Sequence, residues 1–83
     1  MAAAEKRPDW MVAVDEAILE ELRERRLDYV SLIASRRGIH LKYAERRFRT
    51  LERRGFVERT SAEVTYRITA KGERYLEDES PTP

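Results

Sequence analysis

Residues 34–55 read ASRRGIHLKYAERRFRTLERRG, and they contain two helical patterns with a turn between them. The turn is marked by a small residue, Ala34, followed four positions later by Gly38 and then by the apolar Ile39. A small side chain lets two helices approach each other, glycine accepts the left-handed conformation of a tight turn, and the apolar residue fills the corner. The stretch therefore predicts one helix that ends at 37 and a second that runs over 41–54.

The second of these helices has two contrasting faces. Its apolar residues are spaced 3, 4 and 3 apart, which gathers them on one side of a helix with 3.6 residues per turn: Leu41, Ala44, Phe48 and Leu51. The opposite arc holds Lys42, Tyr43, Arg46, Arg49, Thr50 and Arg53, with Arg47 and Arg54 on its flank. So many cations with so few acids are typical of a helix that contacts phosphates, whereas a helix that is merely soluble usually mixes both signs.

Two helices are predicted upstream of the turn. The first covers 14–26, where one apolar stripe is formed by Val14, Ile18, Leu19 and Leu22. Acids gather early in this helix, as the helix dipole favours, and we interpret them as a solvated face: Asp15, Glu16, Glu20 and Glu21. Asp28 is expected to cap the second helix, over 29–37.

The periodicity changes after Gly55. Residues 56–60 and 64–69 have the composition of strands, and Ser61-Ala62-Glu63 separates them, which predicts a β-hairpin. Val64, Tyr66 and Ile68 are expected to face inward, and Thr65 and Arg67 outward. Thr69 is expected to cap a last helix over 70–79, and the prolines of the tail, 80–83, cannot continue it.

The order of these elements is that of a winged helix-turn-helix. We expect a mainly α fold with a small β-hairpin: a three-helix core, a two-stranded wing and a C-terminal helix. Residues 1–8 are interpreted as a flexible arm, 9–79 as the domain and 80–83 as a disordered tail.

Composition excludes several classes of function. The 83 residues include no cysteine and one histidine, which excludes a thiolate zinc site, a multi-histidine metal site and a cysteine nucleophile. No apolar run reaches the length of a membrane span. We therefore expect a cytoplasmic binding module with no cofactor, no metal, no membrane association and no small-molecule ligand, rather than an enzyme.

The net charge of +1 conceals a segregation of charge along the chain. Segment 1–28 carries −3, segment 29–59 carries +6 and segment 60–83 carries −2. The positive centre is where a polyanionic partner would bind. Arginine outnumbers lysine by 14 to 3, which suits phosphate and guanine recognition but also follows from a GC-rich genome.

A recognition helix usually reads bases with its N-terminal half and contacts phosphates with its far end. Base edges are accordingly assigned to Lys42, Tyr43, Arg46 and Thr50, with Arg46 expected on guanine. Phosphates are assigned to Arg47, Arg49, Arg53 and Arg54. In the hairpin, Arg59 and Arg67 are expected to reach the backbone or minor groove, while the wing tip, which has no basic residue, contributes little. His40 is interpreted as a helix cap rather than a sensor.

Two readings are open for the large apolar residues outside these helices. Trp10 and Met11 precede the first helix, and Tyr75 and Leu76 lie in the last. Residues 10–12 are expected to cover the bottom of the core, and the four large residues are also expected to form the interface of a homodimer, which a small domain and a two-fold operator both favour. The two interpretations are compatible.

Three blocks of the chain carry a family resemblance: PDWMxxVDxxILE at 8–20, ERRFRTLxxxGFVER at 45–59 and YRITxKGxxYL at 66–76. The first two resemble small haloarchaeal winged helix-turn-helix regulators, the group that is similar to the repressor of a halobacterial phage. The third is shared by many winged-helix regulators. The resemblance implies a repressor or other transcriptional regulator that binds duplex DNA, with Arg46 and Arg47 as the matched arginine pair.

Two other binding functions compete with sequence-specific DNA binding. A winged-helix module for protein–protein contacts predicts an apolar outer face on the helix over 41–54, and this face is cationic. A small RNA-binding domain usually displays stacking aromatics, for which Tyr43 is the one candidate.

Overall fold

The computed structural model describes residues 7–60 and 65–79, so the predicted wing tip, tail and most of the predicted arm lie outside the described residues. The fold is mostly helical with a small antiparallel sheet, as predicted. Its elements are α2 (Ala13–Arg25), β1 (Leu27–Tyr29), α3 (Val30–Arg37), α4 (Leu41–Arg53), β2 (Val57–Arg59), β3 (Thr65–Ile68) and α5 (Ala70–Glu79). Each helix and hairpin strand begins and ends within two residues of its prediction.

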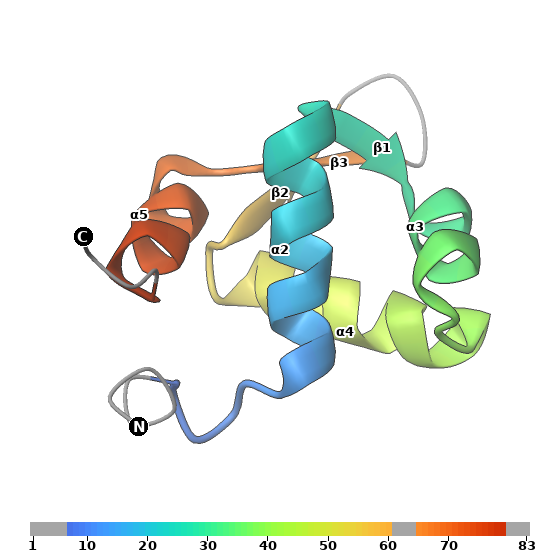
Figure 1. The fold of residues 1–83 in the computed structure, drawn as a ribbon, viewed down its shortest axis with the longest axis horizontal. Coiled ribbons are helices and arrows are strands. Elements are labelled where there is room, and N and C mark those ends of the chain that lie inside the picture. The colour runs from blue at the N-terminus through green and yellow to red at the C-terminus, as the bar shows by residue number, and fades with distance from the viewer. Residues whose placement is uncertain (1–6, 61–64, 80–83) are drawn as a thin grey trace.

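Helix α2 runs down the middle of the view in Figure 1, with the other elements beside and behind it. Its residues Ile18, Leu19 and Leu22 are fully buried. They meet the buried face of α4, where Phe48 lies 4.8 Å from the ring of Tyr66 on β3. In Figure 1, α3 lies on one side of α2 and α5 on the other, while α4 passes behind the lower part of α2. The core therefore holds α4 by one face and leaves the opposite face outside.

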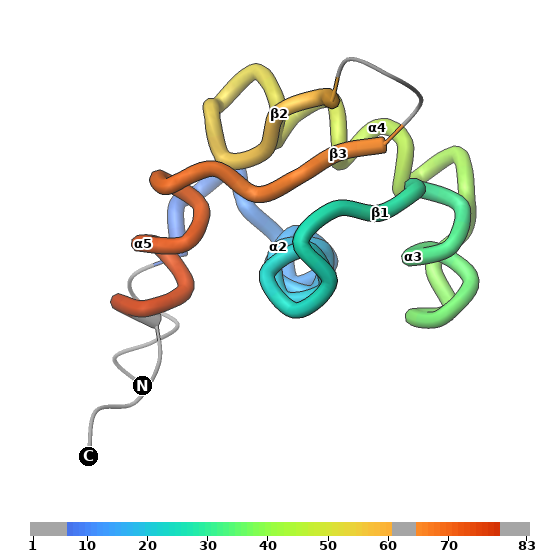
Figure 2. The backbone as a smooth tube through the Cα atoms, turned by 90° about the horizontal axis from the view of Figure 1, so that it is seen from above, coloured from blue at the N-terminus to red at the C-terminus, as the bar shows by residue number. Residues whose placement is uncertain are grey.

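The sheet has three strands rather than the predicted two. Strand order is β1-β3-β2, and both pairs are antiparallel, with Leu27 opposite Arg67 and Val57 opposite Ile68. Figure 2 shows β3 crossing between the other two strands. The prediction missed β1 because three residues are too few to show strand alternation.

Asp28 is a strand residue, which corrects its assignment as the N-cap of α3. Tyr29 takes the N-cap position, and the Asp28 carboxylate accepts hydrogen bonds from the Tyr29 N–H, at 2.8 Å, and from the Arg36 guanidinium. The expectation for Thr65 was also wrong, since its side chain is buried and its hydroxyl hydrogen-bonds that of Thr60.

The turn between α3 and α4 has the predicted geometry. Gly38 has φ = +67°, the left-handed conformation that favours glycine. The Ile39 N–H donates to the Ala34 carbonyl oxygen at 2.8 Å, closing the end of α3, and the Ile39 side chain packs against the core. His40 occupies the N-cap position of α4, but its side chain makes no capping hydrogen bond.

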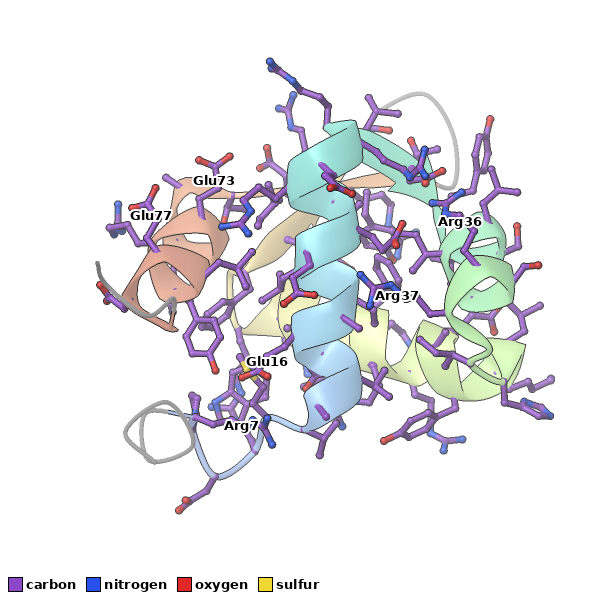
Figure 3. The ribbon with its side chains drawn as sticks, in the orientation of Figure 1. Arg7, Glu16, Arg36, Arg37, Glu73 and Glu77 are labelled. Atoms are coloured by element: carbon purple, nitrogen blue, oxygen red, sulfur yellow. The ribbon has the colours of Figure 1, made fainter. Side chains whose placement is uncertain are left out.

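The N-terminal segment, 7–12, covers the bottom of the core. The Trp10 ring packs edge-on against Phe56 at 5.5 Å, and Met11 is 4% exposed. Arg7, in the predicted arm, donates to both carboxylate oxygens of Glu16, which also accepts from the Tyr75 hydroxyl at 2.6 Å (Figure 3). This arrangement agrees with the core-covering interpretation of these residues.

Candidate nucleic-acid interface

The outer face of α4 consists of Lys42, Tyr43, Arg46, Arg49, Thr50 and Arg53. It lies opposite Ala44, Phe48 and Leu51, which are fully buried, because the apolar stripe anchors the helix. The four cations of this face are exposed, and none of them forms an ion pair with another described residue. This helix therefore presents unneutralised positive charge along its whole length.

Weak contacts along α4 order this face without neutralising it. The Arg46 guanidinium lies 5.5 Å from the centroid of the Tyr43 ring. The Thr50 hydroxyl donates to the Arg46 carbonyl oxygen at 3.2 Å and accepts from the Arg53 Nη2 at 3.4 Å. Arg46 and Arg53 keep further donors free for a ligand, because an arginine carries five N–H groups, and the Tyr43 hydroxyl can both donate and accept.

Arg47 is not part of the outer face, contrary to its assignment as a phosphate contact. Its Nε and Nη2 donate to the Asp15 carboxylate at 2.8 and 2.6 Å, and Nη2 also donates to the Trp10 carbonyl oxygen at 3.0 Å. Its side chain is 17% exposed and Asp15 is fully buried. The hydrogen bonds to Asp15 raise the pKa of Arg47 above its ordinary value. Arg47 therefore ties α4 to α2.

Arg54 also points toward the N-terminal segment. Its guanidinium lies 4.9 Å from the centroid of the Trp10 ring. Its backbone carbonyl oxygen accepts from Lys71 Nζ at 2.9 Å, which joins the end of α4 to α5. Unlike Arg47 it stays exposed, so it borders the outer face at the C-terminal end of α4.

The two arginines of the sheet are paired. Arg59 donates to the Tyr66 hydroxyl at 3.0 Å and lies 3.5 Å from the Glu52 carboxylate. Arg67 donates to Glu58 at 2.6 Å across the β2–β3 register. Both side chains are more than half exposed, so these pairs remain open to exchange with a phosphate.

Two adjoining hollows lie along one flank of α4. One, of about 220 Å³, opens between α4 and the sheet and is lined by Val30, Glu45, Phe48, Arg49, Arg59 and Tyr66. The other, of about 190 Å³, lies at the start of the helix and is lined by Tyr29, Val30, Ser31, Leu41 and Glu45. Leu41 is 43% exposed there, which corrects its assignment to the core stripe.

Two acidic residues of α2 that were expected on a solvated face, Asp15 and Glu21, are buried. Glu21 is 8% exposed and accepts from Arg37 at 2.8 Å, Arg36 at 3.1 Å and Arg25 at 3.3 Å. The Arg37 hydrogen bond lowers the pKa of Glu21, and those from Arg36 and Arg25 add to it against the effect of burial. Glu21 and Asp15 therefore do not belong to a solvated face. These contacts fix α3, and through it the turn into α4.

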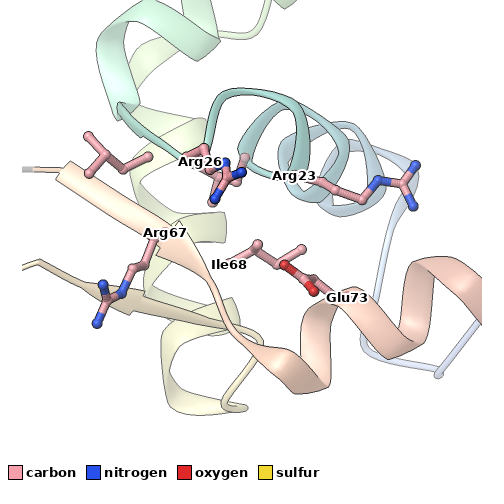
Figure 4. A pocket seen from close by; sticks show the side chains of 7 residues that line it. Arg23, Arg26, Arg67, Ile68 and Glu73 are labelled. Atoms are coloured by element: carbon pink, nitrogen blue, oxygen red, sulfur yellow. The ribbon is translucent and has the colours of Figure 1, made fainter.

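A third hollow lies away from α4, between α2, β3 and α5. It measures about 440 Å³, and its lining includes Arg23, Arg26, Arg67 and Glu73 (Figure 4). Within 7–60 and 65–79 there is no group of three or more His, Asp or Glu side chains that could hold a metal ion. Over the same residues, no helix has the length and hydropathy to cross a bilayer.

The family model of the winged helix-turn-helix phage repressor matches residues 4–82. Among solved structures, the reduced form of MarR from E. coli is similar, with a TM-score of 0.76 and 20% identity over 83% of this chain and 51% of that one. YusO from Bacillus subtilis is also similar, with a TM-score of 0.79 and 17% identity over 94% and 57%. The chain thus spans little more than half the length of either structure. A search of the curated proteins finds no significant match.

Proposed function

This chain belongs to the winged helix-turn-helix phage repressor family, a family of DNA-binding regulators, and we propose that it represses transcription by placing α4 in the major groove of duplex DNA. The observation that carries this proposal is the outer face of α4, which presents Lys42, Arg46, Arg49 and Arg53 without an ion-pair partner among the described residues. Counterions released from DNA by such a face supply affinity.

The position of each side chain along α4 suggests its role. Lys42, Tyr43 and Arg46 lie in the first half of the helix, where base edges are read, and the Arg46 fork suits the O6 and N7 of guanine. Thr50, one turn after Arg46, is also assigned to a base edge. Arg49, Arg53 and Arg54 lie in the second half and are assigned to phosphates. Arg59 and Arg67 reach the flanking backbone by exchanging their carboxylate partners, and Arg47 acts by holding the helix in place.

The protein is proposed to act as a homodimer in the cytoplasm, since a two-fold operator matches a two-fold protein. Of the four residues first assigned to its interface, Met11 and Leu76 are 4% and 3% exposed within one copy and have little surface for a partner, whereas Trp10 and Tyr75 are only partly buried. Sedimentation of the free and DNA-bound protein measures the stoichiometry. The haloarchaeal origin is proposed on the sequence blocks at 8–20 and 45–59 alone.

The test is fluorescence anisotropy with a labelled 30-bp duplex and, separately, an RNA hairpin, across a range of salt. Arg46→Ala and Arg53→Ala are expected to weaken duplex binding by about fivefold or more each, since each removes a phosphate or base contact. The matched control is Arg23→Ala, the same change of charge at a residue that lines the hollow in Figure 4. Equal effects of all three substitutions, or stronger binding to RNA, would overturn the assignment of α4.

A further inference from the structure

We propose that Leu41 reads the 5-methyl group of a thymine in the operator, next to the base that Arg46 contacts. This inference rests on the proposed function and adds an apolar specificity contact to a cationic surface. Leu41 is the first residue of α4 and is 43% exposed, although Ala44 and Phe48, which continue its stripe, are fully buried. The core therefore leaves a large part of this side chain open to a further contact.

The position of Leu41 matches a base contact. Side chains at the start of a recognition helix reach base edges, and apolar side chains there contact the thymine methyl, which projects into the major groove. Lys42 and Arg46 are exposed within the next turn and a half of the helix. A duplex held by these cations brings its base edges to Leu41.

The hollow beside Leu41 favours a base edge over a phosphate. The hollow measures about 190 Å³, and its lining includes the apolar Val30 and Leu41 together with the carboxylate of Glu45. No cation is among the described residues that line it. Glu45 repels a phosphate, whereas its oxygens accept hydrogen bonds from the amino groups of bases. The uncharged edge of a base pair with an apolar methyl fits this lining.

A protein partner is the competing occupant, since Leu32 on α3 is also exposed, at 48%. The charge of this part of α4 favours DNA, because Lys42, the next residue, and Arg46, on the outer face, are exposed cations without acidic partners among the residues described. Leu32, by contrast, does not line either hollow beside α4. It therefore serves as the control: an exposed leucine outside the proposed contact.

The experiment removes only the 5-methyl group of a thymine in the operator and leaves the rest of the duplex unchanged. Operators are first selected with the wild-type protein from a random duplex library, and each thymine of the selected site is then replaced by deoxyuridine. One replacement per half-site is expected to weaken binding about fourfold, the effect of uncovering one methyl group. In Leu41→Ala the same replacement is expected to have no effect, while in Leu32→Ala it keeps its fourfold effect.

Circular dichroism verifies that both variants fold, which is expected because alanine suits an exposed helical position. A deoxyuridine penalty that persists in Leu41→Ala would overturn the inference, as would a site at which no replacement weakens the wild type. In either case selective duplex binding leaves the proposed function standing. If no duplex is bound at any salt concentration, the thymine contact and the proposed function both fail. The exposed Leu41 and Leu32 are then candidates for contacts with a protein partner.

Discussion

At the scale of single residues, Gly72 shows how closely α5 packs on the sheet. A Cβ at this position would lie 2.5 Å from the Phe56 carbonyl oxygen and 2.7 Å from Ile68 Cγ1. We expect Gly72→Ala to lower the free energy of unfolding by about 2–3 kcal/mol through overpacking. Gly38→Ala is the comparison, since nothing lies within 4 Å but φ is +67°, and strain alone there costs about 1 kcal/mol. Urea unfolding measures both, and equal midpoints would contradict the crowding at Gly72.

Arg47 offers a second test at this scale. Arg47→Ala leaves the carboxylate of Asp15 buried without its cation, and we expect a loss of about 3 kcal/mol in the free energy of unfolding. Arg46→Ala changes the preceding residue, which is exposed, and is expected to change the free energy of unfolding by less than about 0.5 kcal/mol. Thermal unfolding of the two variants separates a structural arginine from a DNA-contacting one. The assignment fails if both unfold at the wild-type temperature.

At the scale of elements, Glu21 joins α2 to α3 and makes the pair sensitive to acid. Its pKa lies below the ordinary value of 4.5, chiefly through the Arg37 hydrogen bond. The stabilisation is therefore complete above pH 4.5 and is lost as the pH falls through the lower folded value. We expect Glu21→Gln to be less stable than wild type at pH 7 and to lose less stability between pH 5 and pH 3.

Urea unfolding across this pH range tests the prediction, with Glu24→Gln, an exposed residue of the same helix, as control. Part of the acid sensitivity should remain in Glu21→Gln because of Glu16. Burial raises the pKa of Glu16, but the hydrogen bonds from Arg7 and Tyr75 outweigh it and leave the pKa lowered. If the free energies of unfolding of wild type and Glu21→Gln fall in parallel as the pH is lowered, the ion pairs of Glu21 do not set the response to acid.

The same elements show what can be predicted from sequence. The α3–turn–α4 unit follows from local rules, since helical spacing and a left-handed glycine act within a few residues. Asp15 and Arg47 are 32 positions apart, and Glu21 and Arg37 are 16 apart, so no local pattern links them. The sequence therefore predicts the outer face of α4 but not which of its flanking arginines the fold uses.

At the scale of the whole molecule, the fold divides the positive charge of segment 29–59 into two parts. Arg36, Arg37, Arg47 and Arg59 lie against acids and offset charge within the protein. The exposed cations of α4 and of its C-terminal end are left to make the external field: Lys42, Arg46, Arg49, Arg53 and Arg54. The net charge of this segment thus overstates the positive charge that is exposed to a ligand. The folded protein concentrates that exposed charge on one helix face.

This division predicts the salt dependence of DNA binding. With the five cations that are assigned to phosphates in each bound copy, Arg49, Arg53, Arg54, Arg59 and Arg67, log K should fall against log[salt] with a slope of about −4.5 per copy, since each neutralised phosphate contributes about −0.9. If all nine basic residues of segment 29–59 took part, the slope would be about −8. Anisotropy titrations from 50 to 400 mM salt measure it once sedimentation has given the number of copies bound. Arg53→Ala should make the slope shallower by about 1, whereas Arg23→Ala should leave it unchanged. A slope near −8 would mean that the ion pairs of Arg36, Arg37 and Arg47 also open on DNA, so that the surface of the free protein understates the number of cations that bind.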